Sequence, residues 1–282
     1  MNDYAYHLLN VFTLAGNRLS GNPLCVFEDG RGLDGVTMQA LARQFNLSET
    51  TFIFPSEKAT AAVRIFTPNY EMPFAGHPTL GTAHAVRALR GAGDAVTLEM
   101  RAGVIPVMAE GDHWTLEANA PRYRQVDAAP HQLAEMLGLP AADVLDGARW
   151  VNTGSEQLVI PLRSPEAVSR GQPVLSLLKR YGCVNEDRYL AYVFADTGGG
   201  SVRARFFFPK GTAIAEDPAT GSACANLGGW FLAQGAALPL SRVIRQGDEV
   251  GRPSRLVLRV DGERRIFVSG EVIELGHGVI AL

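Results

Sequence analysis

Two polar side chains, His77 and Asp217, each stand directly before a proline and four residues before a glycine. The stretches that contain them, Phe74–Ala85 and Ile214–Ala225, align residue for residue without a gap. Proline is favourable in the first turn of a helix, because the N–H that it lacks would have no intrahelical acceptor there. The pattern therefore predicts two equivalent helices, each with one polar side chain close to its N-terminal cap.

Small residues follow in both stretches, and they would leave the N–H groups of each first helical turn accessible. Open N–H groups and the helix dipole together attract an anion such as a carboxylate. Two such helices facing each other could hold one small acid. Taken alone, Asp217 is also the residue type of a plain N-cap, and His77 could make a structural hydrogen bond. The symmetry of the two copies favours a functional role for both.

Glu49 is the third candidate for chemistry. Apolar residues recur at helical spacing through Met38–Phe45, and the β-prone run Thr50–Phe54 follows, so Glu49 is expected at a helix-to-strand junction. A carboxyl group shielded from water at such a junction could act as a general acid or base. A solvated glutamate without a catalytic role is the alternative.

The composition and the remaining motifs exclude several functional classes. The chain has 282 residues, of which 46% are hydrophobic and 20% charged, and its net charge of −3 offers no basic surface for nucleic acid. No stretch has the roughly 18 apolar residues needed to span a bilayer, and the N-terminus lacks signal-peptide features, so we expect a cytoplasmic protein without a membrane partner. The three cysteines are scattered, and no metal-binding, nucleotide-binding or serine-hydrolase motif is present.

The predicted elements follow the same plan in both halves of the chain. Helices are predicted at 38–45, 79–90, 168–181 and 219–234. Strands are predicted at 6–12, 24–27, 50–54, 63–66, 96–100, 104–109, 114–118, 157–162, 189–195, 202–208, 256–260 and 266–275. A repeat of this length indicates duplicated domains rather than a solenoid.

Four motifs in order resemble those of the phenazine-biosynthesis PhzF-like family: Gly21–Pro23, Asn46–Thr50, Phe74–Gly81 and Glu216–Ala223. The resemblance implies the diaminopimelate-epimerase-like fold, an α/β (α+β) architecture of two pseudo-symmetric domains. Each domain would be a curved, mostly antiparallel, barrel-like β-sheet around a central helix, with the active site in the cleft between the domains.

The same resemblance implies where the domains begin and end. Because the last strand of this fold usually returns to the first domain, we expect an N-terminal domain of residues 1–118 plus 272–282. The C-terminal domain would then comprise residues 119–271. A homodimer is also expected from the family.

The resemblance further implies the roles of the candidate residues. Related epimerases use two cysteines to move a proton, but Cys224 lies within the second helix, where it is expected to pack against the sheet, and its counterpart is His84. Glu49 would instead shuttle the proton, while His77 and Asp217 hold and polarise the substrate. Ser222 and the N–H groups of Gly221 and Gly76 would receive the substrate carboxylate, and Ser48 is a further expected substrate-binding residue. No metal and no organic cofactor is expected.

The leading hypothesis is therefore a cofactor-independent isomerase that moves a proton within a small, cyclic or amino-bearing carboxylic acid. The reaction implied by the resemblance is the isomerisation of trans-2,3-dihydro-3-hydroxyanthranilate. One alternative is an epimerase or racemase of amino or imino acids, which would need a second acid or base opposite Glu49. Another is a small-acid binding protein that performs no turnover.

Overall fold

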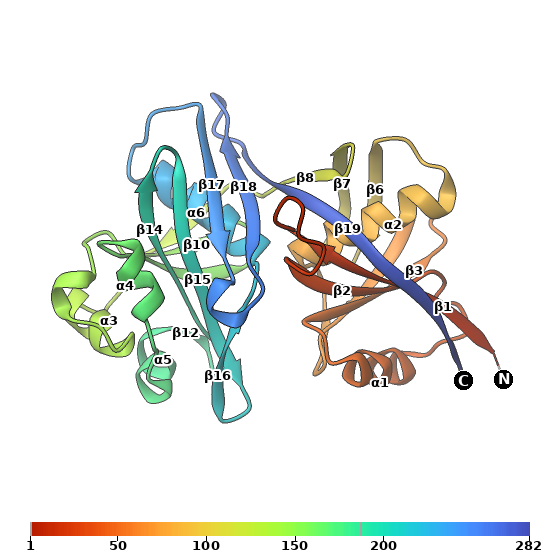
Figure 1. The fold of residues 1–282 in the computed structure, drawn as a ribbon, viewed down its shortest axis with the longest axis horizontal. Helices are drawn as coiled ribbons and strands as arrows, with labels where there is room; N and C mark the ends of the chain where they lie inside the picture. Colours follow the sequence, from red (N-terminus) through yellow and green to blue (C-terminus); the bar gives the residue numbers. More distant parts are fainter. Residues whose placement is uncertain (1, 187) are drawn as a thin grey trace. The chain divides into compact units, whose positions relative to one another are not determined.

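The computed structural model describes residues 2–186 and 188–282, which divide into two compact units (Figure 1). Unit 1 comprises the residues up to Glu117 together with Ser269–Leu282, and unit 2 comprises Ala118–Val268. In each unit, mostly antiparallel strands curve around one central helix. The predicted fold class, two similar α/β units of this kind, is confirmed.

The sheet of unit 1 closes into a barrel. Its strands are β1 (Asp3–Val11), β2 (Asn22–Phe27), β3 (Glu49–Phe54), β4 (Ala61–Phe66), β5 (Glu71–Met72), β6 (Ala95–Met100), β7 (Gly103–Glu110), β8 (His113–Glu117) and most of β19 (Ile266–Ala281). Hydrogen-bonded neighbours follow the order β19, β1, β2, β3, β4, β6, β7 and β8, and β8 pairs with β19 again. The pairs β2–β3 and β4–β6 are parallel.

Helix α2 (Gly76–Arg90) lies inside this barrel, and its residues from His77 to Ala83 are all buried. Gly81 allows the close approach of the helix to the sheet. A Cβ atom at this position would lie 2.5 Å from Leu24 Cδ2 and 2.9 Å from Val11 Cγ2, on β2 and β1. In this copy of the repeat the glycine therefore serves packing.

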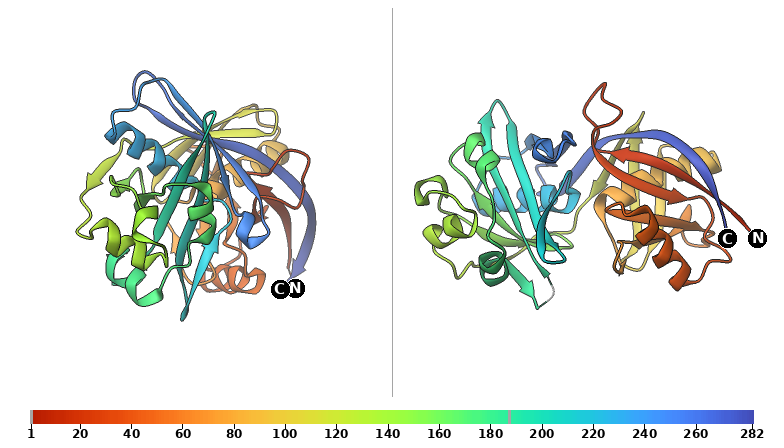
Figure 2. Two further views of the ribbon diagram at one scale, coloured as in Figure 1. Left: turned by 60° about the vertical axis from the view of Figure 1, so that its left-hand side comes forward. Right: turned by 60° about the horizontal axis from the view of Figure 1, so that its bottom comes forward.

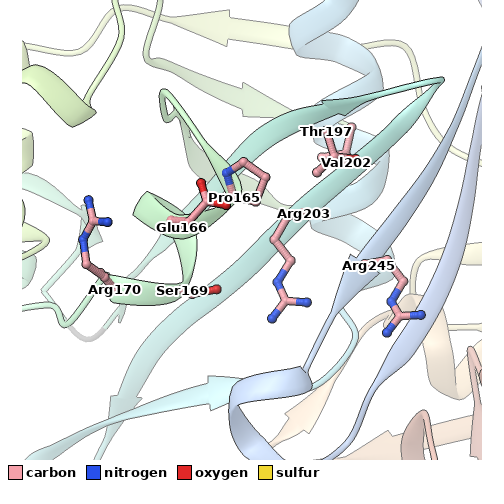
Figure 3. Close-up of a pocket in the computed structure, with 8 residues that line it drawn as sticks. All are labelled: Pro165, Glu166, Ser169, Arg170, Thr197, Val202, Arg203 and Arg245. Carbon is pink, nitrogen blue, oxygen red and sulfur yellow. The ribbon is translucent and has the colours of Figure 1, made fainter.

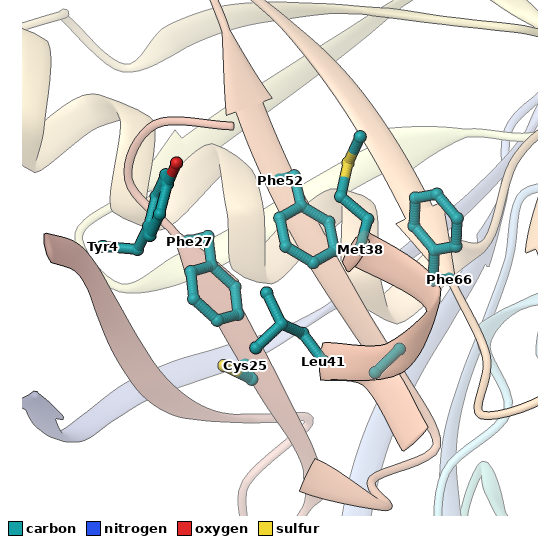
Figure 4. Packing of buried hydrophobic residues seen from close by; sticks show 8 residues of the cluster. Tyr4, Cys25, Phe27, Met38, Leu41, Phe52 and Phe66 are labelled. Atoms are coloured by element: carbon teal, nitrogen blue, oxygen red, sulfur yellow. The ribbon is translucent and has the colours of Figure 1, made fainter. Parts of the chain in front are cut away.

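Helix α1 (Gly35–Phe45) covers the outer face of the same strands (Figure 4). Met38 and Leu41 of α1 pack against Phe27 and Phe52, whose rings stack with centroids 4.8 Å apart. Side chains alternate along β2, so Leu24 meets α2 while Cys25 and Phe27 meet α1. Burial on both faces explains why this strand is continuously apolar in sequence.

Unit 2 repeats this arrangement in its main sheet and adds a separate two-stranded sheet, β12–β13. Its strands are β9 (Arg122–Arg124), β10 (Arg149–Asn152), β11 (Glu156–Pro161), β12 (Cys183–Asn185), β13 (Arg188–Tyr189), β14 (Ala191–Gly198), β15 (Ser201–Lys210), β16 (Ala213–Asp217), β17 (Leu240–Gln246) and β18 (Ser254–Val260). The pairs β11–β14 and β15–β17 are parallel, like β2–β3 and β4–β6. Helix α6 (Gly221–Ala233) corresponds to α2, and it packs on β10, β11 and β18.

The helix predicted at 168–181 needs correction, and several elements of the structure were not predicted. The helix predicted at 168–181 is two short helices, α4 (Pro165–Arg170) and α5 (Leu175–Tyr181). Gly171 ends α4, and Pro173 prevents continuation because it lacks an N–H and disfavours helical geometry in the residue before it. Helix α3 (Pro130–Met136) was not predicted, nor were the strands β5, β9, β10, β12, β16 and β17.

Strand β19 belongs to both units along its length. It starts after the turn at 261–265 in unit 2, continues into unit 1, and pairs antiparallel with the whole of β1. At the far end the backbones of Asn2 and Leu282 exchange two hydrogen bonds of 2.7 and 2.9 Å. Both views of Figure 2 show β1 and β19 running together toward the termini.

Candidate active site

Glu49 lies where the sequence predicts, as the first residue of β3 after α1. Helix α1 ends at Asn46, whose left-handed backbone (φ 51°) turns the chain toward the strand. Strand β3 then runs parallel to β2, with Glu49 beside Leu24. The side chain is 15% exposed, so the solvated alternative does not describe it.

His77 lies in the first turn of α2 and contacts Glu49 directly. Its Nε2 is 3.3 Å from Glu49 Oε2, but the two atoms are not aligned as a hydrogen bond. The ring also hydrogen-bonds the backbone of Pro23, which can offer only its carbonyl. Because Nε2 makes no hydrogen bond, Nδ1–H must be the donor to Pro23. The Gly-Asn-Pro motif thus positions the histidine that faces the glutamate.

Burial determines the protonation state of His77. The ring is 6% exposed, and burial lowers its pKa to about 3, although the hydrogen bond to Pro23 acts in the opposite direction. His77 is therefore a neutral imidazole at physiological pH, with its proton on Nδ1 and the unprotonated Nε2 3.3 Å from Glu49 Oε2. This arrangement suits the acceptance of a hydrogen bond from a protonated Glu49.

We expect His77→Gln to make the unfolding free energy depend less on pH between about pH 3 and 6.5. The pKa of His77 is about 3 when folded and 6.5 ordinarily, so between these values the unfolded chain binds more protons than the folded protein. As far as His77 determines it, the unfolding free energy of wild type should therefore be highest above pH 6.5 and should decline as the pH falls toward 3. Urea unfolding of both proteins at pH 7, 5.5 and 4.5 measures this, and parallel pH slopes would contradict it.

Two further candidates lie beside this pair in unit 1. Gly76 is the first residue of α2, and Ser48 immediately precedes β3; both are partly exposed. The N-cap of α2, Ala75, has no side-chain acceptor, so the first-turn N–H groups are not capped by a side chain. The chemistry available here is a carboxyl group, a neutral imidazole and N–H donors.

Asp217 is placed differently from its counterpart His77. It is the last residue of β16, where it pairs with Phe206 of β15, and α6 begins only at Gly221. The N-cap is Thr220, so the interpretation of Asp217 as a plain N-cap is wrong. The strand pairing keeps the backbone extended through Asp217, whereas the aligned segment of the first copy is already helical from Gly76.

The Asp217 carboxylate is instead held by the capping residue. Thr220 Oγ1 donates a 2.6 Å hydrogen bond to Asp217 Oδ2. The buried Gln246 of β17 donates from Nε2 to Thr220 Oγ1 at 2.9 Å and to the Asp217 carbonyl at 2.8 Å. Sequence analysis missed Gln246, because its strand was not predicted and its partners are distant in the chain.

Ser222 and Gly221 form the first turn of α6. The Ser222 hydroxyl oxygen accepts a 2.8 Å hydrogen bond from Nε2 of Gln157 on β11. Gln157 also contacts the buried Asn226 one turn further along α6. These two amides were not identified from the sequence, although a lone asparagine in an otherwise apolar helix is a recognisable signal.

A buried ion pair supports the strand that carries Asp217. Arg205 of β15 contacts Glu216 Oε2 through Nε at 2.9 Å and through a terminal nitrogen at 2.8 Å, and the two side chains are 10% and 5% exposed. Arg205 also donates to the carbonyls of Val168, Ser169 and Gly171 at the end of α4. Unit 1 has the equivalent pair, Arg64 with Glu71, but there the arginine is 36% exposed.

An open surface pocket on unit 2 contains none of the candidate residues (Figure 3). Its arginines already pair with carboxylates: Arg170 with Asp143 at 2.6 Å, Arg203 with Glu249 at 2.6 Å, and Arg245 with an Asp248 that also contacts Arg203. The pocket therefore has little unneutralised charge with which to bind an anion.

The cysteines do not offer a second mechanism. Cys25 and Cys224 are fully buried, and burial raises the pKa of both thiols, which disfavours the reactive thiolate. Over residues 2–186 and 188–282 no cluster of three or more His, Cys, Asp or Glu side chains could hold a metal ion. Over the same ranges no helix is long and apolar enough to cross a membrane.

Comparison with known proteins relates this arrangement to a family. A family model described as "Phenazine biosynthesis-like protein" (PhzC-PhzF) matches residues 9–278. An uncharacterized isomerase of Pasteurella multocida is 40% identical over 288 residues, covering 98% of this chain and 93% of that protein. A trans-2,3-dihydro-3-hydroxyanthranilate isomerase of Pseudomonas aeruginosa is 35% identical over 267 residues, covering 92% of this chain and 91% of that protein.

A solved structure shares the whole fold. It is described as a predicted epimerase from Pseudomonas aeruginosa, and it matches with a TM-score of 0.81 at 28% sequence identity, covering 99% of each chain. The similarity therefore spans both units and all four sequence motifs.

Proposed function

Because the chain belongs to the phenazine biosynthesis-like (PhzC-PhzF) family of isomerases, we propose that it isomerises a small carboxylic acid by moving one proton. The observation that carries the proposal is the shielded Glu49 carboxyl group, 3.3 Å from a neutral His77. The proposed substrate class is that of trans-2,3-dihydro-3-hydroxyanthranilate, the compound named for the Pseudomonas aeruginosa relative. We further propose that the reaction needs no cofactor.

In this mechanism Glu49 removes the proton from the hydroxyl-bearing carbon. The electron pair of the broken C–H bond moves into the conjugated system, and Glu49 returns the proton to another carbon, which gives an enol. The enol then becomes the ketone as its O–H proton passes to water and a ring carbon takes up a proton from water. One carboxyl group with two oxygens suffices for such a transfer. While Glu49 is protonated, Nε2 of His77 can accept its hydrogen bond and stabilise that form.

The remaining candidates would bind and orient the acid. We propose Ser48 and Gly76 of unit 1 and Gly221 and Ser222 of unit 2 as substrate-binding residues, and we assign the carboxylate to the Gly221 N–H and the Ser222 hydroxyl group. Asp217, held by Thr220, would pair with an amino or hydroxyl group. We also propose that the protein acts as a homodimer in the cytoplasm, and light scattering of the purified protein tests the dimer.

Proton NMR in deuterated water tests the proposed reaction. With trans-2,3-dihydro-3-hydroxyanthranilate and wild-type protein, we expect deuterium to enter a ring carbon as the ketone forms. Exchange without net isomerisation would favour an epimerase, an alternative supported by the similar structure described as a predicted epimerase. Stabilisation by the acid without any exchange would identify a binding protein and overturn the proposal.

A further inference from the structure

A continuous chain of hydrogen bonds runs through unit 2 and ends at Ser222. It begins at the backbone of Thr153, passes through the side chains of Asn226 and Gln157, and reaches the serine hydroxyl. Asn226 is fully buried and Gln157 is 2% exposed, so water does not compete for these groups. The chain connects the strands β10 and β11 to the N-terminus of α6.

The direction of every hydrogen bond in this chain is fixed by its first member. The Thr153 N–H can only donate, and it donates to Asn226 Oδ1 at 2.9 Å. Nδ2 of Asn226 therefore faces the other way, and it donates to Gln157 Oε1 at 2.6 Å and to the Ser155 carbonyl at 2.8 Å. With its oxygen occupied, Gln157 presents Nε2 to Ser222 Oγ at 2.8 Å.

Ser222 is consequently an acceptor toward the protein interior. Among the described residues its hydroxyl hydrogen has no acceptor, and the side chain is partly exposed at the start of α6. A serine hydroxyl can both accept and donate, so fixing the accepting side leaves the O–H to donate outward. Outward donation matches a ligand group that has only lone pairs, such as a carboxylate.

The equivalent position in unit 1 lacks this arrangement. Thr82 of α2 aligns with Ser222 in the repeat, but it is fully buried and its hydroxyl contacts that of Thr51 at 2.8 Å. Either of these two hydroxyl groups could be the donor, so nothing fixes the direction. The chain of hydrogen bonds that ends at Ser222 is therefore specific to the second copy, and the pseudo-symmetry of the fold does not account for it.

We infer that Gln157 and Asn226 are positioning residues that hold Ser222 as a hydrogen-bond donor toward the carboxylate of the ligand. The inference rests on the proposed function, because that proposal assigns the carboxylate to Ser222. Beyond that proposal, we infer that the two buried amide side chains, which do not touch the ligand, set the preference for an acid over a neutral analogue.

The test is a double-mutant cycle on ligand binding. The probe is 3-hydroxyanthranilate, an aromatic acid with the same substituents as the proposed substrate, and its binding is measured by calorimetry. We expect Ser222→Ala to weaken binding about tenfold, as for a hydrogen bond to a charged group, and Gln157→Met to weaken it about three- to tenfold. Because Gln157 acts through Ser222, the double variant should bind no more weakly than Ser222→Ala alone.

Two further variants separate positioning from loss of structure. Asn226→Asp should invert the Gln157 amide, draw the Ser222 hydrogen inward and weaken binding in the same non-additive way. Thr82→Val removes the hydroxyl at the matched position of α2, and it should leave probe affinity unchanged while circular dichroism reports its stability. Comparison with the neutral probe 3-hydroxyanthranilamide should show that Gln157→Met reduces the preference for the acid.

The outcomes distinguish this inference from the proposed reaction. Additive effects of Gln157→Met and Ser222→Ala, or equal losses for the acid and the amide, would overturn the positioning role. No binding of the acid by wild type would overturn it as well, since Ser222 would then face no carboxylate. Binding of the acid without any isomerisation in the NMR experiment would count against the proposed reaction alone.

Discussion

Glu49→Gln is expected to lower the turnover of a competent substrate by about a thousandfold or more. The amide keeps the shape of the side chain and its place at the start of β3, but it cannot take up or return a proton. Binding of the acid should persist, because the groups assigned to its carboxylate are unchanged. The result would appear as a loss of kcat with little change in KM.

A second glutamate of unit 1 provides the matched control. Glu28 also contacts a histidine, with Oε1 2.8 Å from His7 Nε2, but it is 34% exposed and has no part in the proposed site. Glu28→Gln removes the same charge from the same kind of pair, and its activity should equal that of wild type. Retention of wild-type activity by Glu49→Gln would remove the proton shuttle from the mechanism.

Arg205→Met is expected to destabilise the protein by about 3–5 kcal/mol, the usual consequence of leaving a buried charge without its partner. Glu216 would lose its guanidinium, and the carbonyls at the end of α4 would lose their donor. Arg64→Met makes the same change in the more exposed pair of unit 1, where about 1 kcal/mol or less is expected. Denaturant unfolding of both variants compares them.

The pH dependence of this loss identifies its cause. Burial raises the pKa of Glu216 above its ordinary value of 4.5, and Arg205 opposes that shift. A carboxyl group whose pKa is raised on folding contributes most to the free energy of unfolding at low pH, where it is protonated. That contribution is lost as the pH rises through the folded-state pKa. Without Arg205 the pKa should rise further, so the loss should be greater at pH 7.5 than at pH 5. A loss of stability that does not depend on pH would refute this account. So would a pH-dependent loss that persists in the double variant Arg205→Met, Glu216→Gln.

The repeat was the most informative feature of the sequence. It predicts two equivalent central helices, and the close packing of Gly81 against Leu24 and Val11 shows why the first of them has a glycine there. The helix-to-strand junction at Glu49 was also predictable, because helical spacing ends at a residue that adopts the left-handed cap, Asn46. These are local properties, governed by side chains within a few positions of one another.

Features that depend on distant strands could not be predicted. The gapless alignment implies that His77 and Asp217 are equivalent, yet pairing with β15 keeps Asp217 in a strand while His77 is helical. The roles of Gln157 and Gln246 depend on contacts between strands and α6 that no periodicity reports. Burial of His77, and hence its neutral state, likewise results from the closed barrel around it.

The path of β19 has a consequence for the order in which the protein can fold during translation. One of the two strands that pair with β1 is the segment after Ser269, which the ribosome makes only after all of unit 2. At roughly 5–20 residues per second, β1 waits many seconds for this second neighbour. Unit 2 can therefore complete its core while the barrel of unit 1 is still open, with the edges of β1 and β8 unpaired on that side. A cell that makes this protein must protect those edges until the final strand emerges.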